Sequence, residues 1–187
     1  MRAGLLLLCA IVSETSAAQP RIAEGIPTDS IRQFPPVKGT NLEGRSFSLP
    51  SDFESTYNVV LVAFRREQQV DVDTWIPFLR EQRLAERGIR VYELPTLGRS
   101  YRIMRRAIDG GMARGIKDKA TREATITLYI DKSPFKRALA IANEEQVAVL
   151  LVARDGRVLW RGAGRFNAVI GGRLMASVDS LGVRDAP

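Results

Sequence analysis

Residues 59–64 form a continuous apolar run, which is the pattern of a strand buried on both faces of a sheet. Before this run, residues 46–49 alternate polar and apolar side chains between a turn glycine, Gly44, and a proline, Pro50. The alternation predicts a short, half-exposed strand or hairpin over residues 42–50. The pattern therefore begins with a hairpin and a central strand.

Beyond the central strand, apolar residues recur at helical spacing in several stretches, with further β-rich stretches between them. Pro77 lies inside the first helical stretch and should kink it, and Gly88 follows its end. Pro134 opens a later helix at the first helical position. The predicted elements are a helix over 71–87, a strand over 89–94, a helix over 100–112, a strand over 124–130, a helix over 133–142 and a closing helix over 170–181.

The clearest local signal is Asp155-Gly156, a two-residue turn between the apolar stretches 147–152 and 157–160. It predicts a β-hairpin. Gly162-Ala163-Gly164, which follows the hairpin, predicts another turn, because a phosphate-binding loop would open a βαβ unit instead. The complete order favours an α/β fold, in which a mixed sheet has helices on both faces and a C-terminal β-hairpin plus helix.

The N-terminal region has the layout of an export signal. Arg2 precedes an apolar run over residues 3–12, and the small residues Ala17 and Ala18 follow. The run is well short of the roughly 20 residues that span a bilayer as a helix, so an uncleaved anchor is the weaker alternative. We expect a signal peptide at residues 1–18, a linker or arm at 19–36, a domain at 37–187 and a periplasmic location.

Cysteine and histidine usage excludes several kinds of chemistry. Cys9 is the only cysteine and lies inside the expected signal peptide, and the chain has no histidine. The exported chain could therefore form no disulfide, and it could use neither thiol catalysis nor a histidine triad. Zinc sites of the usual Cys/His type are excluded as well. We expect no enzyme activity of these kinds, no metal and no cofactor.

The chain is basic, with 28 lysines and arginines against 21 acidic residues and a net charge of +7. A surface of this charge favours acidic partners such as anionic lipid, acidic proteins or nucleic acid. Nucleic acid is the least favoured of the three, because aromatic side chains on which bases could stack are scarce. Trp160 and Phe166, near the hairpin, are flanked by arginines, but the chain has no RNA-binding module signature. The expected partners are therefore a protein client and an anionic membrane surface.

The order of elements over residues 37–181 resembles the thioredoxin-like superfamily in its extended, peroxiredoxin-like form. In secreted thiol reductases of that superfamily, a buried strand ends in phenylalanine, a Cys-x-x-Cys pair occupies the fifth and eighth positions after it, and a proline follows. Counting from Phe64, those positions are Gln69, Val72 and Pro77. The proline is present and both cysteines are replaced, so the resemblance implies a thioredoxin-like domain that has lost its thiol pair.

Three stretches resemble the mitochondrial ATP synthase assembly factor family, a thioredoxin-like group, more closely. They are 41–45, 102–116 with its paired glycines Gly110 and Gly111, and 150–164, the most specific of the three. Members of this family help a subunit of the membrane sector into the complex. The resemblance therefore implies non-catalytic binding of a membrane-protein client.

The loop after the central strand is the first candidate site, because folds of this class present functional groups there. It contains Arg65, Arg66, Glu67, Gln68 and Gln69. Its arginine and glutamine donors could bind an anionic ligand or a peptide. The alternative is a solvated polar loop inherited from a redox ancestor.

Asp71 and Asp73 follow this loop at the expected start of a helix. They could form a general-base or metal-binding pair. A carboxylate is also favoured in the first turn of a helix by the unpaired backbone N–H groups, and this is the preferred interpretation.

The second candidate site is the basic helix expected at residues 100–112. Its arginines are predicted to share one face, opposite an apolar stripe that should face the core. The stripe contains Tyr101, Met104, Ile108 and Met112, and the basic face contains Arg102, Arg105 and Arg106. The alternative is an ordinary charged helix face. With the loop, the candidate partner-binding residues are Arg65, Arg66, Gln69, Arg102, Arg105 and Arg106.

The sequence thus predicts a redox-inactive thioredoxin-fold protein of the cell envelope that binds or helps assemble a membrane-associated protein complex. The first alternative is an enzyme or binding protein that takes an anionic small molecule at residues 65–73. The second is a degenerate relative of the thiol peroxidases.

Overall fold

The computed structural model describes residues 32–182 of the chain. The apolar run 59–64 forms most of strand β4 (Tyr57–Ala63), and Val59, Val60, Leu61 and Val62 are fully buried. β4 pairs in parallel with β5 (Ile89–Gly98) and antiparallel with β7 (Ala148–Ala153). The expected central strand is therefore confirmed. The signal peptide expected at residues 1–18 lies outside the described residues.

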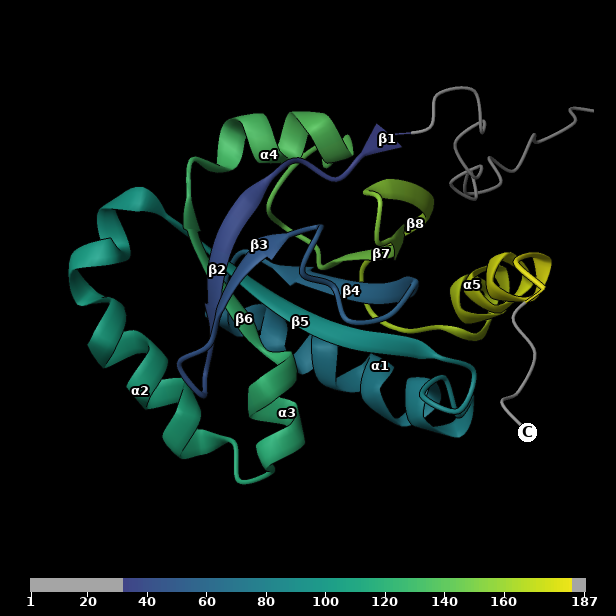
Figure 1. The fold of residues 1–187 in the computed structure, drawn as a ribbon, viewed down its shortest axis with the longest axis horizontal. Coiled ribbons are helices and arrows are strands. Elements are labelled where there is room, and N and C mark those ends of the chain that lie inside the picture. The colour runs from purple at the N-terminus through teal and green to yellow at the C-terminus, as the bar shows by residue number, and fades with distance from the viewer. Residues whose placement is uncertain (1–31, 183–187) are drawn as a thin grey trace, which may run out of the picture. The chain divides into compact units, whose positions relative to one another are not determined.

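One mixed sheet contains all the described strands (Figure 1). Its order is β1 (Arg32–Gln33), β8 (Arg157–Ala163), β7, β4, β5, β6 (Ile126–Ile130), β2 (Val37–Asn41) and β3 (Ser46–Leu49). The hairpin predicted around Asp155-Gly156 is the pair β7–β8, and the hairpin predicted over 42–50 is completed by β2, which the sequence did not predict as a strand. β2 lies between β3 and β6, where a Cβ on Gly39 would come within 2.6 Å of the Ile126 side chain.

Helices cover both faces of the sheet, as expected for this fold class. The helices are α1 (Gln69–Glu81), α2 (Arg105–Gly115), α3 (Lys119–Ala124), α4 (Lys132–Leu139) and α5 (Ala168–Ser180), with 3-10 turns η1 (Arg66–Gln68) and η2 (Arg99–Met104). α1 and α5 pack on one face through Trp75, Leu79, Leu174 and Val178. α4 packs on the other face through Phe135 and Leu139. α3 was not predicted from the sequence.

The helix predicted over 71–87 is shorter than expected. α1 begins at Gln69, contains Pro77 and ends at Glu81, because Arg83 has a positive φ of 50° that a right-handed helix cannot continue through. The chain then proceeds in successive turns that still bury Leu84. These turns bring the chain to β5, which begins at Ile89.

Residues just before Val37 lie against the domain. β1 pairs with β8, and the neighbouring Phe34 is only 2% exposed. The Phe34 ring contacts Phe53 and Phe135 edge-on, each at 5.6 Å between centroids. The final residues of the stretch assigned to an arm, 19–36, therefore contribute to the core on the α4 face of the sheet.

Candidate functional site

The loop that joins β4 to α1 is held in place by a buried glutamine. Gln68 is 4% exposed, and its side-chain oxygen accepts hydrogen bonds from the backbone N–H groups of Phe64 at 2.7 Å and Arg65 at 3.2 Å. The Gln68 amide nitrogen donates to the carbonyl oxygen of Glu144 at 2.9 Å. One side chain thus fixes the end of the central strand, the start of α1 and the loop before β7.

Both positions where the resemblance places thiols are occupied by groups that cannot do thiol chemistry. Gln69 donates from its side-chain amide to the Asp73 carboxylate at 2.9 Å. Val72 is 2% exposed and packs in the core between the sheet, α1 and α5. Residues 32–182 contain neither cysteine nor histidine. The start of α1 is therefore a hydrogen-bonded and packed structural element.

Four exposed residues surround this start of α1 and are here called the α1-entry surface: Arg65, Arg66, Glu67 and Val70. Val70 is 64% exposed. Within the described part of the chain, neither Arg65 nor Arg66 forms an ion pair. The surface therefore presents two arginines without an ion pair, one glutamate and an apolar side chain.

Asp71 and Asp73 point to different partners. The Asp71 carboxylate pairs with Arg165 at 3.3 Å, whereas Asp73 accepts the hydrogen bond from Gln69. Asp71 lies in the first turn of α1, where the sequence placed a helix-stabilising carboxylate. Among residues 32–182 no group of three carboxylate, cysteine or histidine side chains could hold a metal ion.

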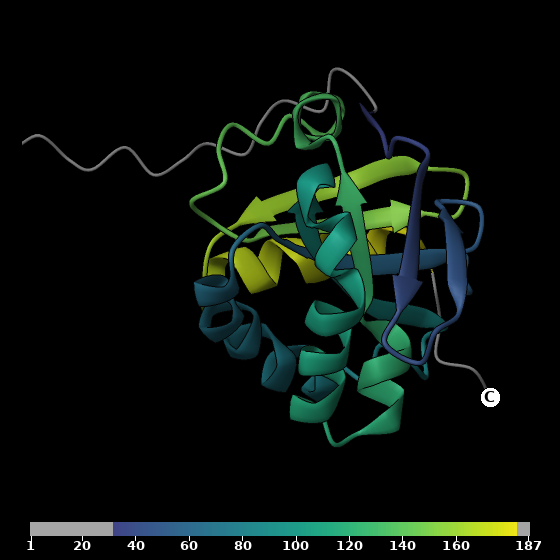
Figure 2. The ribbon, with the colours of Figure 1, turned by 90° about the vertical axis from the view of Figure 1, so that its left-hand side faces the viewer.

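The basic segment is divided into a 3-10 turn and a helix. η2 continues directly into α2, and Figures 1 and 2 show α2 at the periphery of the domain beside β6 and α3. Arg102 and Arg106 are exposed and form no ion pair among the described residues. Arg105 instead pairs with Asp109 at 3.2 Å, and Asp109 accepts a hydrogen bond from the Tyr129 hydroxyl at 2.8 Å. Arg105 therefore helps to anchor α2 on β6.

The predicted core-facing stripe of this segment is wrong in its first half. Tyr101 is 51% exposed and Met104 is 57% exposed, and Ile103 beside them is 95% exposed. The reason is that residues 99–104 form a 3-10 turn, whose period of about three residues does not continue the α-helical stripe. Ile108 and Met112, the second half of the predicted stripe, lie in α2 and are half-buried.

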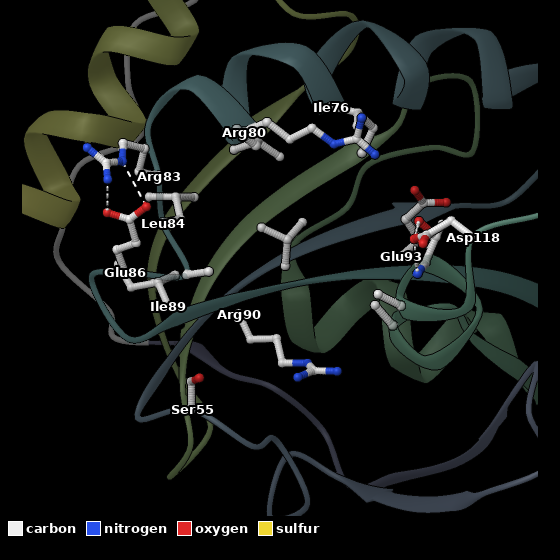
Figure 3. Close-up of a pocket in the computed structure, with 16 residues that line it drawn as sticks. Ser55, Ile76, Arg80, Arg83, Leu84, Glu86, Ile89, Arg90, Glu93 and Asp118 are labelled. Carbon is white, nitrogen blue, oxygen red and sulfur yellow. Dashed lines mark hydrogen bonds and ion pairs between the residues drawn. The ribbon is translucent and has the colours of Figure 1, made fainter. Parts of the chain in front are cut away.

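A pocket of about 600 Å³ lies between α1, β5 and α3. Leu79, Leu84 and Ile89 form part of its apolar lining. Figure 3 shows Arg80 on the α1 wall of the pocket and Arg90 on the β5 wall. Glu93 and Asp118 lie at one end of the pocket. Arg83 and Glu86, which form an ion pair 2.5 Å long, lie at the other end. None of residues 65–73 lines this pocket, so the loop arginines Arg65 and Arg66 lie outside it.

Glu93 is a largely buried carboxylate in the pocket lining that the sequence interpretation did not single out. Burial raises the pKa of the Glu93 carboxyl; the hydrogen bond from Gln69 acts in the opposite direction, and the nearby Asp73 carboxylate raises the pKa further. The signal was present, since an acidic residue interrupts the apolar strand predicted at 89–94. Its link to Gln69 was not readable, because 24 positions separate them in the sequence and only the parallel pairing of β4 with β5 brings them together.

Replacing Glu93 with glutamine should stabilise the protein at about pH 7 and leave its stability unchanged at about pH 3.5, which is below the ordinary glutamate pKa of about 4.3. Because the raised pKa lets the folded state keep a proton that the unfolded chain loses, stability falls as pH rises from the unfolded to the folded pKa. Urea unfolding of the wild type and Glu93→Gln at both pH values measures this. The control is Glu86→Gln, because the Glu86 carboxylate is exposed and paired with Arg83. A Glu93→Gln variant that is less stable than the wild type at pH 7 would contradict the interpretation.

Comparison with known proteins identifies the fold. The structure is similar to BsSco, a member of the Sco family of cytochrome c oxidase assembly proteins, with a TM-score of 0.55, 12% identity, and coverage of 82% of this chain and 96% of that chain. It is also similar to a putative electron transport protein from Aquifex aeolicus VF5 (TM-score 0.57, 8% identity, 79% and 96% covered). A third is a putative thiol:disulfide interchange protein DsbE from Chlorobium tepidum (TM-score 0.50, 13% identity, 81% and 96% covered).

These similarities establish an α/β fold of the thioredoxin-like class. No protein-family model matches the sequence, and no curated protein matches it either. The closer resemblance to the ATP synthase assembly factors stays a prediction.

Proposed function

We propose that this protein is a redox-inactive thioredoxin-fold protein of the cell envelope that binds a protein client and helps to assemble a membrane-associated complex. The proposal rests on the start of α1, where the thiol positions are replaced and the surface is exposed. The two thiol positions hold Gln69 and Val72, and the loop is fixed by Gln68, yet the surface around them remains exposed. A preformed loop binds a partner without a large cost of ordering.

The α1-entry surface indicates the chemistry of the client. Arg65 and Arg66 supply charged donors that suit carboxylates, and Val70 supplies an apolar contact beside them. A client segment with acidic residues next to an apolar side chain would complement this surface. The Sco family to which BsSco belongs is one of cytochrome c oxidase assembly proteins, so a domain of this fold class serves assembly in at least one other family.

The proposed location in the envelope rests on the signal-like N-terminal sequence, with its Arg2 and the apolar run 3–12. Among residues 32–182, no helix has the length and apolar character needed to cross a bilayer. Membrane association is proposed to come from the client complex.

Cross-linked affinity purification from the native envelope, followed by assembly analysis, tests the proposed function. We expect the wild type to recover subunits of one membrane complex, and deletion of the gene to lower the amount of that complex on native gels. Arg65→Ala/Arg66→Ala should recover at least tenfold less, equivalent to about 1.4 kcal/mol of binding free energy.

The matched control for this experiment is Arg114→Ala/Arg137→Ala, which removes the same charge from exposed positions on α2 and α4. It should recover the complex as the wild type does. If both double variants recovered equally little of the complex, the loss would be due to net charge and not to the α1-entry surface. An unchanged level of every membrane complex after gene deletion would reject the assembly role.

A further inference from the structure

The η2 turn exposes an unusual concentration of large apolar side chains. We define the η2 surface as Arg99, Tyr101, Arg102, Ile103, Met104 and Arg106. Every residue of η2 is exposed, and Ile103 is 95% exposed. Single exposed apolar residues are normal on soluble proteins, but three in four consecutive positions on one protruding turn indicate an interaction site.

The charge around these apolar residues has one sign. No acidic residue occurs between Glu93 and Asp109 in the sequence, and Asp109 is already bonded to Arg105 and Tyr129. Within residues 32–182, Arg99, Arg102 and Arg106 have no carboxylate partner. The partner of this surface must therefore supply both negative charge and an apolar environment.

The turn is held firmly enough to present these groups together. α2 is fixed to β6 through the Tyr129 hydroxyl, Asp109 and Arg105. Ile108 and Met112 of α2 are half-buried. η2 itself follows directly from β5, a strand of the sheet. Because both ends of the turn are anchored, Ile103 projects from a fixed support.

We infer that the η2 surface docks the protein on an anionic lipid bilayer. Ile103 and Met104 enter the boundary between headgroups and acyl chains, and Tyr101 lies at the headgroup level, where tyrosine is favoured. The three unpaired arginines contact lipid phosphates while their aliphatic stems follow the apolar side chains inward. This inference is independent of the client proposed for the α1-entry surface, which lies at the start of α1 on other residues.

Vesicle flotation with the full chain tests this inference. We expect binding to vesicles of phosphatidylcholine mixed with phosphatidylglycerol, little binding to phosphatidylcholine alone, and release at high salt. Arg99→Ala/Arg102→Ala/Arg106→Ala should lower the partition coefficient on the order of a hundredfold, and Ile103→Ser on the order of fivefold. All variants keep residues 1–31, so the apolar run at 3–12 contributes equally to each.

The matched control is Arg80→Ala/Arg114→Ala/Arg137→Ala, which removes three exposed arginines that form no ion pair among residues 32–182 and should bind vesicles as the wild type does. In a second measurement, Ile103→Trp should show a blue-shifted emission with anionic vesicles and none with neutral ones. Equal loss of binding in both triple variants, or an unshifted emission, would overturn the inference. So would a wild-type dimer that Ile103→Ser converts to a monomer, because the apolar residues would then contact a second copy of the chain. Because vesicles contain no protein client, the outcome leaves the proposed function untouched.

Discussion

Trp75→Ala is expected to lower the free energy of unfolding by about 4 kcal/mol, the range for removal of a large aromatic side chain from a core. Trp75 is fully buried, and its ring contacts Phe166 edge-on at 5.5 Å and Phe78 at 6.4 Å between centroids. Its indole N–H also donates to the carbonyl oxygen of Gly164 at 2.9 Å. The substitution removes ring contacts and leaves that carbonyl without its donor, so two costs add.

Urea unfolding followed by far-ultraviolet circular dichroism measures the effect, since the midpoint should fall while the slope stays constant. Trp160→Phe is the control, because Trp160 is only half-buried on β8 and the substitution leaves an aromatic ring at this position. We expect the control to lose less than about 1.5 kcal/mol. A Trp75→Ala variant as stable as the control would show that the contacts between α1 and the 164–166 segment contribute little.

Phe34→Ala is expected to cost about 3 kcal/mol, although Phe34 lies outside the predicted domain boundary at Val37. The ring fills the core between Phe53 and Phe135, and the Phe34 backbone N–H donates to the carbonyl oxygen of Gly156 at 2.7 Å. The substitution leaves this backbone bond possible and removes the ring alone. The expected loss therefore reports the packing of the segment on the domain.

The neighbouring Gln33→Ala is the control for this prediction, because Gln33 is exposed and belongs to the same strand, β1. Its free energy of unfolding should stay within about 0.5 kcal/mol of wild type. Thermal and urea unfolding of both variants give the comparison. If Phe34→Ala were no less stable than Gln33→Ala, the segment before β2 would not contribute to the core.

Local sequence patterns predicted the centre of the fold. The apolar run of β4 and the Asp155-Gly156 turn are signals carried by neighbouring residues, and both elements formed as expected. The segment around Phe34 offered no such signal, because one aromatic residue before Pro35 and Pro36 has no periodicity. Its partners, Phe53 and Phe135, are distant in sequence, and only the tertiary fold brings them to Phe34.

The candidate site divides in the same way. A loop does follow the central strand, as the sequence predicted, but the hydrogen bond from Gln68 to the carbonyl of Glu144 joins residues 76 positions apart and could not be predicted. The apolar stripe containing Tyr101 and Met104 failed because a spacing of three fits a 3-10 turn as well as an α-helix. A residue pattern gives the period of a helix only when the helix is long enough to distinguish 3.0 from 3.6 residues per turn.

The position of β4 in the sheet has a consequence for biosynthesis. β4 is flanked by β5, which follows it closely, and by β7, which is made only after residue 147. β1 likewise has no partner until β8 has been made. A nascent chain therefore exposes one unpaired edge of β4, a largely apolar strand, until β7 has been made, which is a risk for aggregation. Fragments that end before β7 should need a holding chaperone, whereas the complete chain closes this edge itself.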